Sequence, residues 1–399
     1  MLLLHLLSVH LLALVTTESG LFASHSKQAA GLRHATESVV GTCDANDPAA
    51  CFGNGVCTAA RTCACDSGWK SAECDVLALG VSGLDAGYRN ASNPVWGGTV
   101  VQHNGQYHMF MGGKKVSTAR SATSKTTRAV RAVGSAPDGP FRYVEEVTAT
   151  PPASLGPGGI GLRVDVHRTP NGSLALFTAA ALDGKFGLVL LVSPLGDPAG
   201  PWYGSLLFHV RINASARWDC GQINDPSASI AADGSLLVVF RSLYGCGGTK
   251  LERIGLLHAP HWTSALSRVT SDASSPLFGF LVSNEDPYIW RSKRGVHMLM
   301  HTQGGVDGPW PDRKTRGAVA FAPGDGTNIS AWRVSSKEAW SASVVWVNGS
   351  ATQALRRQRP ALVFNAAGAP THLITGVNFA SSDWHATNAD WTLITPLEH

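Results

Sequence analysis

Short apolar runs separated by glycine-containing turns dominate the chain from about residue 90 onward. The turn Asp233-Gly234, for example, is followed by an apolar run from Leu236 to Phe240. Such runs between turn residues indicate buried strands, and no long stretch has the 3.6-residue period of an amphipathic helix. The 43 glycines and 21 prolines occur without low-complexity runs, which is typical of many short strands. We therefore expect an all-β fold.

One pattern occurs five times: a small polar or charged residue, usually followed by proline, then a strand, a turn with glycine and another strand. In the last three copies the proline precedes the turn glycine by eight positions, as Pro226 precedes Gly234. The first copy is longer and the second lacks the proline. A hairpin repeated in one register predicts that residues 85–395 form a five-bladed β-propeller, with a β-sandwich as the alternative. The copies begin at Asn93, Asp165, Asp225, Asp286 and Arg359.

The sequence opens with a nearly continuous apolar run from Met1 to about Thr17. This run is too short for a membrane span with anchoring flanks, so residues 1–24 are predicted to be a signal peptide and residues 25–42 a linker. An uncleaved anchor is the alternative, because the segment before the run has no Lys or Arg. No later apolar run approaches the ~20 residues that a membrane helix needs.

Six of the eight cysteines lie between residues 43 and 74, in a segment too small to fold without covalent bonds. Their spacing alone allows fifteen pairings. The ending Cys63-Ala-Cys65 with Gly68-Trp69 resembles an epidermal-growth-factor-like (EGF-like) module, whereas a zinc site would need two C-x-x-C knuckles. No acidic residue directly precedes Cys43, so we expect no calcium there. The resemblance implies the disulfides Cys43–Cys57, Cys51–Cys63 and Cys65–Cys74.

The other two cysteines and five acceptor sequons agree with a secreted, extracellular glycoprotein. Cys220 and Cys246 flank a strand-rich stretch and are predicted to pair. The net charge is only +4 and the basic residues are scattered, so nothing indicates nucleic-acid binding. The predicted glycosylation sites are Asn90, Asn171, Asn213, Asn328 and Asn348.

Acidic residues at the blade starts would converge at one mouth of the propeller channel, which suits glycoside hydrolysis by two carboxyl groups. The five segments resemble the five-bladed clan that includes glycoside hydrolase family 43, with arabinan- and xylan-acting enzymes. The resemblance implies that Glu285 in Asn-Glu-Asp-Pro is the general acid and that Asp225 in Asn-Asp-Pro orients and tunes it. Asp286 stands where the family often has glycine, and its charge would raise the pKa of Glu285.

The first copy departs from this family. Asn93 occupies the position of the catalytic base, and an asparagine cannot take a proton from water. Asp165 is the predicted substitute, with Asp85, which lies before the first blade, as a weaker candidate. A histidine such as His167 is an alternative acid or base. Further residues are expected to bind substrate, although an arginine can equally neutralise the acids and a tryptophan can equally pack between blades. These candidates are Asn93, Trp96, Asp286, Trp310 and Arg359, with Arg241 as a weaker one.

Two functions follow from these features. The first is a secreted hydrolase that cleaves extracellular polysaccharide, with arabinose or xylose units, by inversion. The second is a non-catalytic carbohydrate-binding or adhesion protein with a degenerate site, which Asn93 favours. The EGF-like module is interpreted as a protein contact or as a structural cap, and a purely protein-binding ectodomain is a third hypothesis. No cofactor is predicted, apart from a structural calcium that the family sometimes holds beside a channel histidine, here His372.

Overall fold

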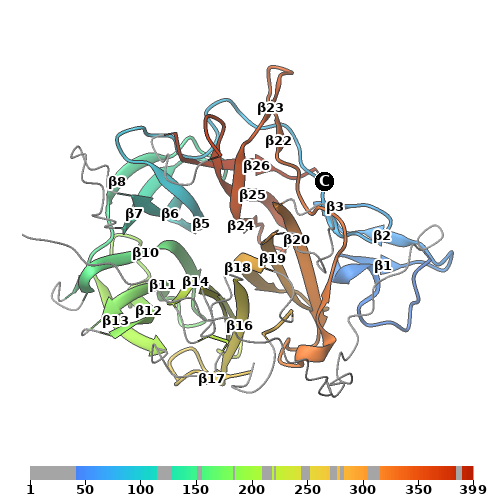
Figure 1. Ribbon diagram of the computed structural model, residues 1–399, viewed down its shortest axis with the longest axis horizontal. Coiled ribbons are helices and arrows are strands. Elements are labelled where there is room, and N and C mark those ends of the chain that lie inside the picture. The colour runs from blue at the N-terminus through green and yellow to red at the C-terminus, as the bar shows by residue number, and fades with distance from the viewer. Residues whose placement is uncertain are drawn as a thin grey trace, which may run out of the picture. The chain divides into compact units, whose positions relative to one another are not determined.

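The computed structural model is an all-β, five-bladed propeller preceded by a small disulfide-rich module (Figure 1). It describes residues 42–114, 127–150, 155–182, 185–208, 218–219, 222–243, 252–269, 276–278, 283–303, 315–382 and 389–398. The chain divides into two units, Met1–Val39 and Val40–His399, and every described residue belongs to the second. The predicted signal peptide and linker therefore lie outside the described residues, apart from Thr42. No described helix is long and apolar enough to cross a membrane.

Each blade is built on consecutive antiparallel strands, of which the first lies innermost, beside the channel (Figure 1). The first two blades are β5 (Val95–His103), β6 (Gln106–Lys114), β7 (Thr127–Gly134) and β8 (Arg142–Glu146), then β10 (Leu155–Arg168), β11 (Leu174–Leu182), β12 (Lys185–Ser193) and β13 (Trp202–Phe208) with β9 (Ala149–Thr150). Of the described strands, only the short β9 of the second blade joins its blade in parallel, at β13. The third and fourth are β14 (Gln222–Ile230), β15 (Leu236–Leu243), β16 (Arg253–Ala259) and β17 (Ser267–Arg268), then β18 (Ser283–Arg291), β19 (Gly295–Gln303), β20 (Thr315–Pro323) and β21 (Arg333–Val334). The fifth is β24 (Arg356–Phe364), β25 (Pro370–Asn378) and β26 (Trp391–Pro396), and the hairpin β22 (Ser343–Val345) and β23 (Ala351–Gln353) precedes it.

The segment that follows the small module closes the ring of blades. Leu79 pairs with Leu397, and Tyr88 pairs with Thr392, so residues 79–88 run along the outer edge of β26. The fifth blade has three strands of its own, and this segment covers the edge that would otherwise remain open. The two ends of the described chain are thereby joined in one blade.

The blades bury apolar residues on both faces of their sheets. In β15, residues 236–240 have no exposed surface, and the corresponding strands β11 and β19 are similarly buried. A strand buried on both faces reads as a continuous apolar run instead of an alternating one. This is the physical reason for the short apolar runs that predicted the strands.

A β-bulge interrupts the innermost strand of each blade near its start and aims side chains into the channel mouth. Asp225 and Pro226 together oppose Phe240, and Asp286-Pro287 and Arg359-Pro360 occupy the same place in their blades. The residues before the three prolines all have left-handed backbone, with φ of 49°, 54° and 55°. The predicted common register is thus confirmed for the last three blades.

The predicted starts of the first two blades are wrong. In the first blade the bulge is Gly97-Gly98, four residues after Asn93-Pro94. In the second blade the register shifts before Val164, which places Arg163 where the third blade has Asp225. Asp165 then corresponds to Ser227, because each accepts a backbone N–H from the next blade: that of Ala228 and that of Ile289.

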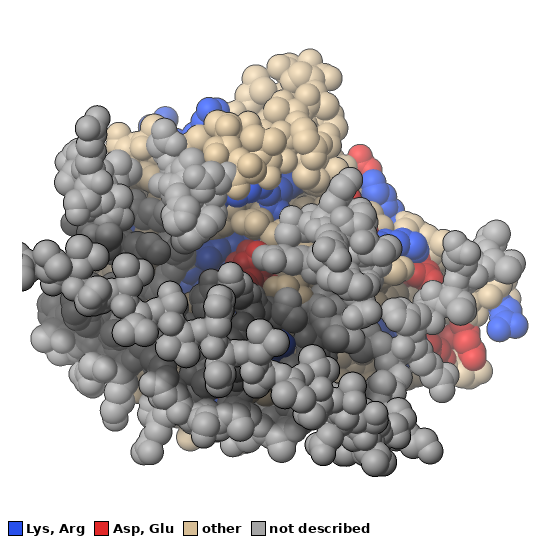
Figure 2. All heavy atoms as spheres, viewed as in Figure 1, with Lys and Arg blue, Asp and Glu red and all other residues tan. Residues whose placement is uncertain are grey.

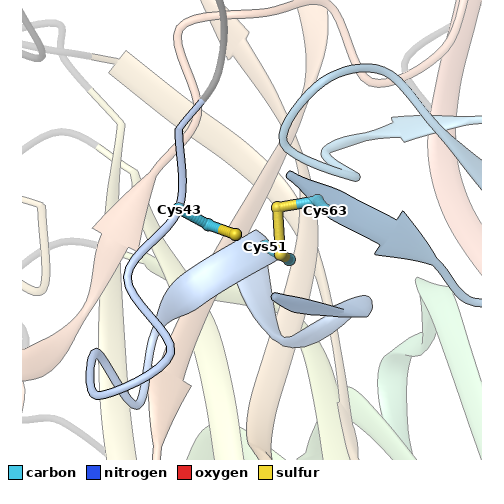
Figure 3. Close-up of side chains that lie close together, drawn as sticks. All are labelled: Cys43, Cys51 and Cys63. Atoms are coloured by element: carbon cyan, nitrogen blue, oxygen red, sulfur yellow. A yellow bond between two sulfur atoms is a disulfide. The ribbon is translucent and has the colours of Figure 1, made fainter. Parts of the chain in front are cut away.

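The small module contains η1 (Ala50–Gly53), β1 (Gly55–Cys57), β2 (Cys63–Cys65), β3 (Trp69–Lys70) and β4 (Val76–Leu77). Its three disulfides are the predicted ones, Cys43–Cys57, Cys51–Cys63 and Cys65–Cys74. Figure 3 shows Cys43, Cys51 and Cys63 close together with the bond between the last two. Their sulfurs are in disulfides, so they cannot bind zinc as thiolates. The predicted pair Cys220–Cys246 lies outside the described residues.

The module packs against the fourth and fifth blades. The ring of Trp69 stacks on that of Trp290, with centroids 6.3 Å apart, and both belong to one apolar cluster. Asp66 pairs with Arg294, and Lys337 reaches Asp75 at 3.3 Å. These contacts support the interpretation of the module as a structural cap.

Candidate active site

The bulges bring oppositely charged side chains together at the mouth of the channel. The Arg359 guanidinium lies 3.0 Å from a carboxylate oxygen of Asp225 and 3.3 Å from one of Asp286. Arg163, from the second blade, donates to the carbonyl of Pro360 at 3.0 Å. All four charged side chains are buried. They form the floor of the site, and Figure 2 shows acidic and basic atoms meeting in a hollow near the middle of one face.

A second group of charged side chains surrounds Arg241 on β15. Its guanidinium lies 2.8 Å from Asp225, 3.0 Å from Glu252 and 2.9 Å from Glu285. Glu285 and Glu252 remain 15% and 12% exposed, more than any carboxylate of the floor. They are therefore the acidic groups that a ligand entering the mouth would meet.

The two exposed carboxyl groups titrate in opposite directions. Burial raises the pKa of Glu252 to about 9, and the nearby charge of Glu285 adds to this effect against the attraction of Arg241. Burial also acts to raise the pKa of Glu285, but the hydrogen bond from His301 and the charges of His301 and Arg241 outweigh it. The pKa of Glu285 is held well below its usual range. At neutral pH this pair is one carboxylic acid beside one carboxylate.

The remaining titratable groups reinforce this arrangement. His301 Nδ1 lies 2.8 Å from Glu285, and this contact raises the pKa of His301 although burial lowers it. Burial raises the pKa of Asp286 to about 6 against the opposing charge of Arg359. The structure thus gives Asp286 the raised pKa that was expected for Glu285.

Four of the residues predicted from the sequence lie together here: Asp225, Glu285, Asp286 and Arg359, with Arg241 beside them. Sequence reasoning missed Arg163, Glu252 and His301. Val164 precedes Gly172 by the same eight positions as Pro226 precedes Gly234, and this spacing could have identified Arg163. Glu252 precedes β16 without any motif, and His301 lies within the apolar strand β19, where no motif marks it.

The first blade contributes no carboxylate to the floor. Gly97 occupies the bulge with φ of 69°, and a Cβ there would lie 2.7 Å from the Cβ of Arg359. Asn93 lies elsewhere and accepts a hydrogen bond from Arg128. The assignment of Asn93 to the base position is therefore wrong, because that position belongs to Gly97.

The predicted binding tryptophans do not extend the site within the described residues. Trp96 is only 5% exposed and packs under the guanidinium of Arg356, 4.5 Å from the ring centroid. Its faces are used for packing between blades. Trp310 lies outside the described residues.

Asp165 lies below the floor, between the second and third blades. It has no exposed surface, and it accepts hydrogen bonds from the Ser227 hydroxyl at 2.7 Å and the Ala228 N–H at 2.8 Å. Its third contact is His167 Nε2 at 3.0 Å. Burial acts to raise the pKa of Asp165, but the charge and hydrogen bond of His167, the charge of Arg163 and the N–H of Ala228 outweigh it and lower this pKa. A carboxylate so enclosed has no surface from which to reach a substrate water.

A cation site is suggested by Glu285, Asp286 and His301, whose ligand atoms lie within 4.8 Å of one another. Calcium prefers six to eight oxygen ligands. Here two of the three groups already contact guanidinium groups, Glu285 that of Arg241 and Asp286 that of Arg359. The donor set therefore does not fit the calcium that the resemblance suggested, and His372 lies outside this cluster.

Comparison with known proteins supports both parts of the protein. The Teneurin-like EGF domain family matches residues 48–77. A search of curated protein sequences gives no match. Among solved structures, a complex of BT0996 with RGII superposes with a TM-score of 0.57 at 10% identity, covering 80% of this protein and 91% of that one.

Two further structures of named enzymes are similar. A thermostable family-43 glycoside hydrolase gives a TM-score of 0.50 at 11% identity, covering 77% of this protein and 90% of that one. The catalytic domain of a GH62 α-L-arabinofuranosidase from Coprinopsis cinerea gives 0.50 at 12% identity, covering 78% and 96%. At such identities the likeness concerns the fold. The protein therefore consists of an EGF-like module followed by a five-bladed propeller with the fold of family-43 and GH62 glycoside hydrolases.

Proposed function

We propose that the protein is an extracellular glycoside hydrolase that cleaves polysaccharide, with arabinose- or xylose-containing chains as the first candidates, at the channel mouth. The observation that carries this proposal is the pair Glu252 and Glu285, two partly exposed carboxyl groups that one guanidinium holds together at the channel mouth. Their surroundings raise the pKa of Glu252 and lower that of Glu285. Two adjacent acids with divided pKa values are a recurrent arrangement for glycosidic bond cleavage. The three disulfides of the module agree with an oxidising, extracellular location.

In this proposal Glu252 donates its proton to the departing glycosidic oxygen while the bond to the anomeric carbon breaks. Glu285, held ionised by His301 and Arg241, stabilises the positive charge that develops at that carbon. Water supplies the new hydroxyl, and its proton restores Glu252. Asp225 and Arg359 act as positioning residues, because they hold Arg241 and Asp286 in place.

The spacing of the pair bears on stereochemistry. Inverting enzymes hold their carboxyl groups ~6.5–9.5 Å apart and retaining enzymes ~5–5.5 Å apart. Glu252 and Glu285 both contact Nη1 of Arg241, at 3.0 and 2.9 Å. The two carboxyl groups also hydrogen-bond to each other, so they lie closer than in either class, and their spacing assigns neither outcome. The resemblance predicts inversion with another base. The enclosure of Asp165 disfavours it as that base.

The test incubates purified protein with arabinosyl, xylosyl and galactosyl substrates and follows sugar release and the first-formed anomer by NMR. Wild-type release that Glu252→Gln and Glu285→Gln each reduce at least ~100-fold supports the proposal. Glu398→Gln, which changes an exposed carboxylate, is the matched control. Full activity of either channel variant would contradict the assignment of the pair.

A second function, carbohydrate binding without cleavage, is favoured by Gly97. The floor has no first-blade carboxylate, and the Arg359 side chain leaves no room for one. Saccharide binding without release from any substrate, unchanged in Glu252→Gln, would place the protein in this class.

A further inference from the structure

The far half of the channel encloses a second cavity, which we call the rear cavity. Its volume is about 610 Å³, within the ~300–1,000 Å³ of small-molecule sites. Each innermost strand contributes the residue four positions after the first bulge residue, so the rear cavity lies ~13 Å along the strands from the floor. These five lining residues are Val101, His167, Ser229, Trp290 and Val363.

Hydrogen bonds join neighbouring inner strands beyond the floor, at the level where the rear cavity begins. The Thr99 hydroxyl accepts from the N–H of Val166, the Ser227 hydroxyl accepts from that of Ile289, and the Tyr288 hydroxyl donates to the carbonyl of Leu362. With the contacts of Asp165 they link the five blades in sequence. None of the charged residues of the floor lines the rear cavity, so the two sites have different residues.

The charged and imidazole side chains that line the rear cavity are basic, in contrast to the acidic residues of the channel mouth. No Asp or Glu is among its described lining residues, whereas an arginine and two histidines are. Arg168 is held in place, since its guanidinium donates to the carbonyls of Gly172 at 3.0 Å and Gln102 at 3.2 Å. It makes no ion pair with any carboxylate of the described residues. A fixed, uncompensated guanidinium is a recognition group for a carboxylate.

His167 is fixed next to this arginine. Its Nε2 lies 3.0 Å from the buried carboxylate of Asp165, and its ring packs edge-on against Phe177. The side chain is 22% exposed, and the structure gives its Nδ1 no hydrogen-bond partner among the described residues. A clamped imidazole beside a clamped guanidinium offers two oriented groups to one ligand.

The remaining walls are aromatic and apolar. Tyr107, Tyr288, Trp290 and Phe364 line the rear cavity, and Trp290 is supported from behind by Trp69 of the small module. Such walls suit the body of a ring-shaped ligand, and the polar side chains of Gln102, Asn365 and Thr371 line the rest of the cavity.

We propose that the rear cavity binds a compact organic carboxylate carried on a ring, at a site separate from the candidate active site. Arg168 and His167 bind the carboxylate and the aromatic walls contact the ring. Two sources offer this chemistry, namely a uronic acid unit of a saccharide and an aromatic carboxylate.

The test measures binding by isothermal titration calorimetry with galacturonic acid, benzoate, inorganic phosphate and the neutral sugar galactose. A ring carboxylate is expected to bind at least ~10-fold more tightly than galactose or phosphate. Whichever of galacturonic acid and benzoate binds more tightly identifies the source. Equal binding of galactose or phosphate would overturn the role of the carboxylate or of the ring.

Two variants locate the binding. Arg168→Gln removes the charge and is expected to weaken the ring carboxylate at least ~10-fold, whereas Arg142→Gln, at an exposed arginine elsewhere, leaves it unchanged. Ala366→Trp fills the rear cavity without changing charge and should also abolish binding. If both variants bind as the wild type does, with unchanged melting temperature, the proposal is wrong. Glu285→Gln separates the two sites, because it should abolish sugar release and keep this binding.

Discussion

At the channel mouth the first bulge residues are mostly charged, and four positions further along the same strands the side chains are apolar, hydroxyl or imidazole. Among the described residues the mouth holds four carboxyl groups, and Arg241 and Arg359 form ion pairs with all of them. The rear cavity holds Arg168 and no described carboxylate. One repeated strand therefore carries two different chemistries, and what separates them is position relative to the bulge.

The channel mouth and the rear cavity stabilise their charged side chains in different ways. Charges buried without partners cost several kcal/mol, so the mouth is stable only as a complete set. Arg168 is exposed and keeps its solvation, so it can stay uncompensated until a ligand arrives. Variants at the mouth should therefore affect stability, and variants at the rear should affect binding.

Arg241→Ala should produce the largest effect. It removes the guanidinium that contacts Asp225, Glu252 and Glu285, and it leaves those groups facing one another in a poorly solvated site. We expect a loss of ~3–5 kcal/mol in the free energy of unfolding, measured by urea denaturation. Arg168→Ala at the rear should change this free energy by less than ~0.5 kcal/mol. Similar losses in both variants would remove the contrast between the two ends.

Gly97→Ala should come next. The added Cβ would meet Arg359 at 2.7 Å, and the backbone is left-handed, so the bulge and the arginine cannot both keep their places. We expect a loss of ~2–4 kcal/mol in the free energy of unfolding, from a strained backbone and a displaced buried arginine. Gly105→Ala is the matched control, because Gly105 has φ of 75° but nothing within 4 Å, and should cost only ~1–2 kcal/mol. Equal costs would show that Arg359 does not fill the first-blade position.

The bulge positions also show which parts of the fold and of the site could be predicted from the sequence. The strands and the last three bulges were predictable because Pro at a fixed distance from a turn glycine marks one register. The bulge at Gly97 could not be predicted. Its glycine makes room for Arg359, 262 positions later, and this is recognised only when the first and fifth blades lie side by side. The same holds for Glu252, because burial and the charge of Glu285 raise its pKa against the attraction of Arg241, and no neighbour in sequence does so.

Asp165 is the reverse case, a residue to which the sequence analysis gave a catalytic role and which the structure places in the packing between blades. Its acidic character suggested chemistry, but its place after the bulge gives it the hydrogen-bonding role that Thr99 and Ser227 have in their blades. An acid at a blade start can therefore be structural, and only the bulge register separates the two roles.

Asp165→Asn should have a smaller effect on stability than Gly97→Ala. It tests whether Asp165 has a structural or a catalytic role. The amide keeps the shape but loses the charge that holds His167 and faces Arg163, so we expect a loss of ~1–2 kcal/mol. The pKa of Asp165 is lowered, so its contribution is present above the unfolded pKa of ~3.9 and is lost as pH falls through the folded value. The difference between wild type and variant should thus vanish in acid. A large drop in sugar release at unchanged stability would instead make Asp165 part of the active site.

The pH dependence of sugar release is the finest test, because it reports on the mouth alone. Glu252 must be protonated to donate, and its pKa is raised to about 9, so release should persist through neutral pH and fall as pH passes about 9. Asp225→Asn removes one of the negative charges that raise the pKa of Glu252 and should lower that upper limit slightly, since less repulsion then opposes the ionised form of Glu252. Arg168→Gln at the rear should leave the profile unchanged. If release already falls as pH rises through about 6, Glu252 is ionised at neutral pH, and the proton donor would then have to be another group of the mouth, with Asp286 the next candidate because its own pKa is raised to about 6.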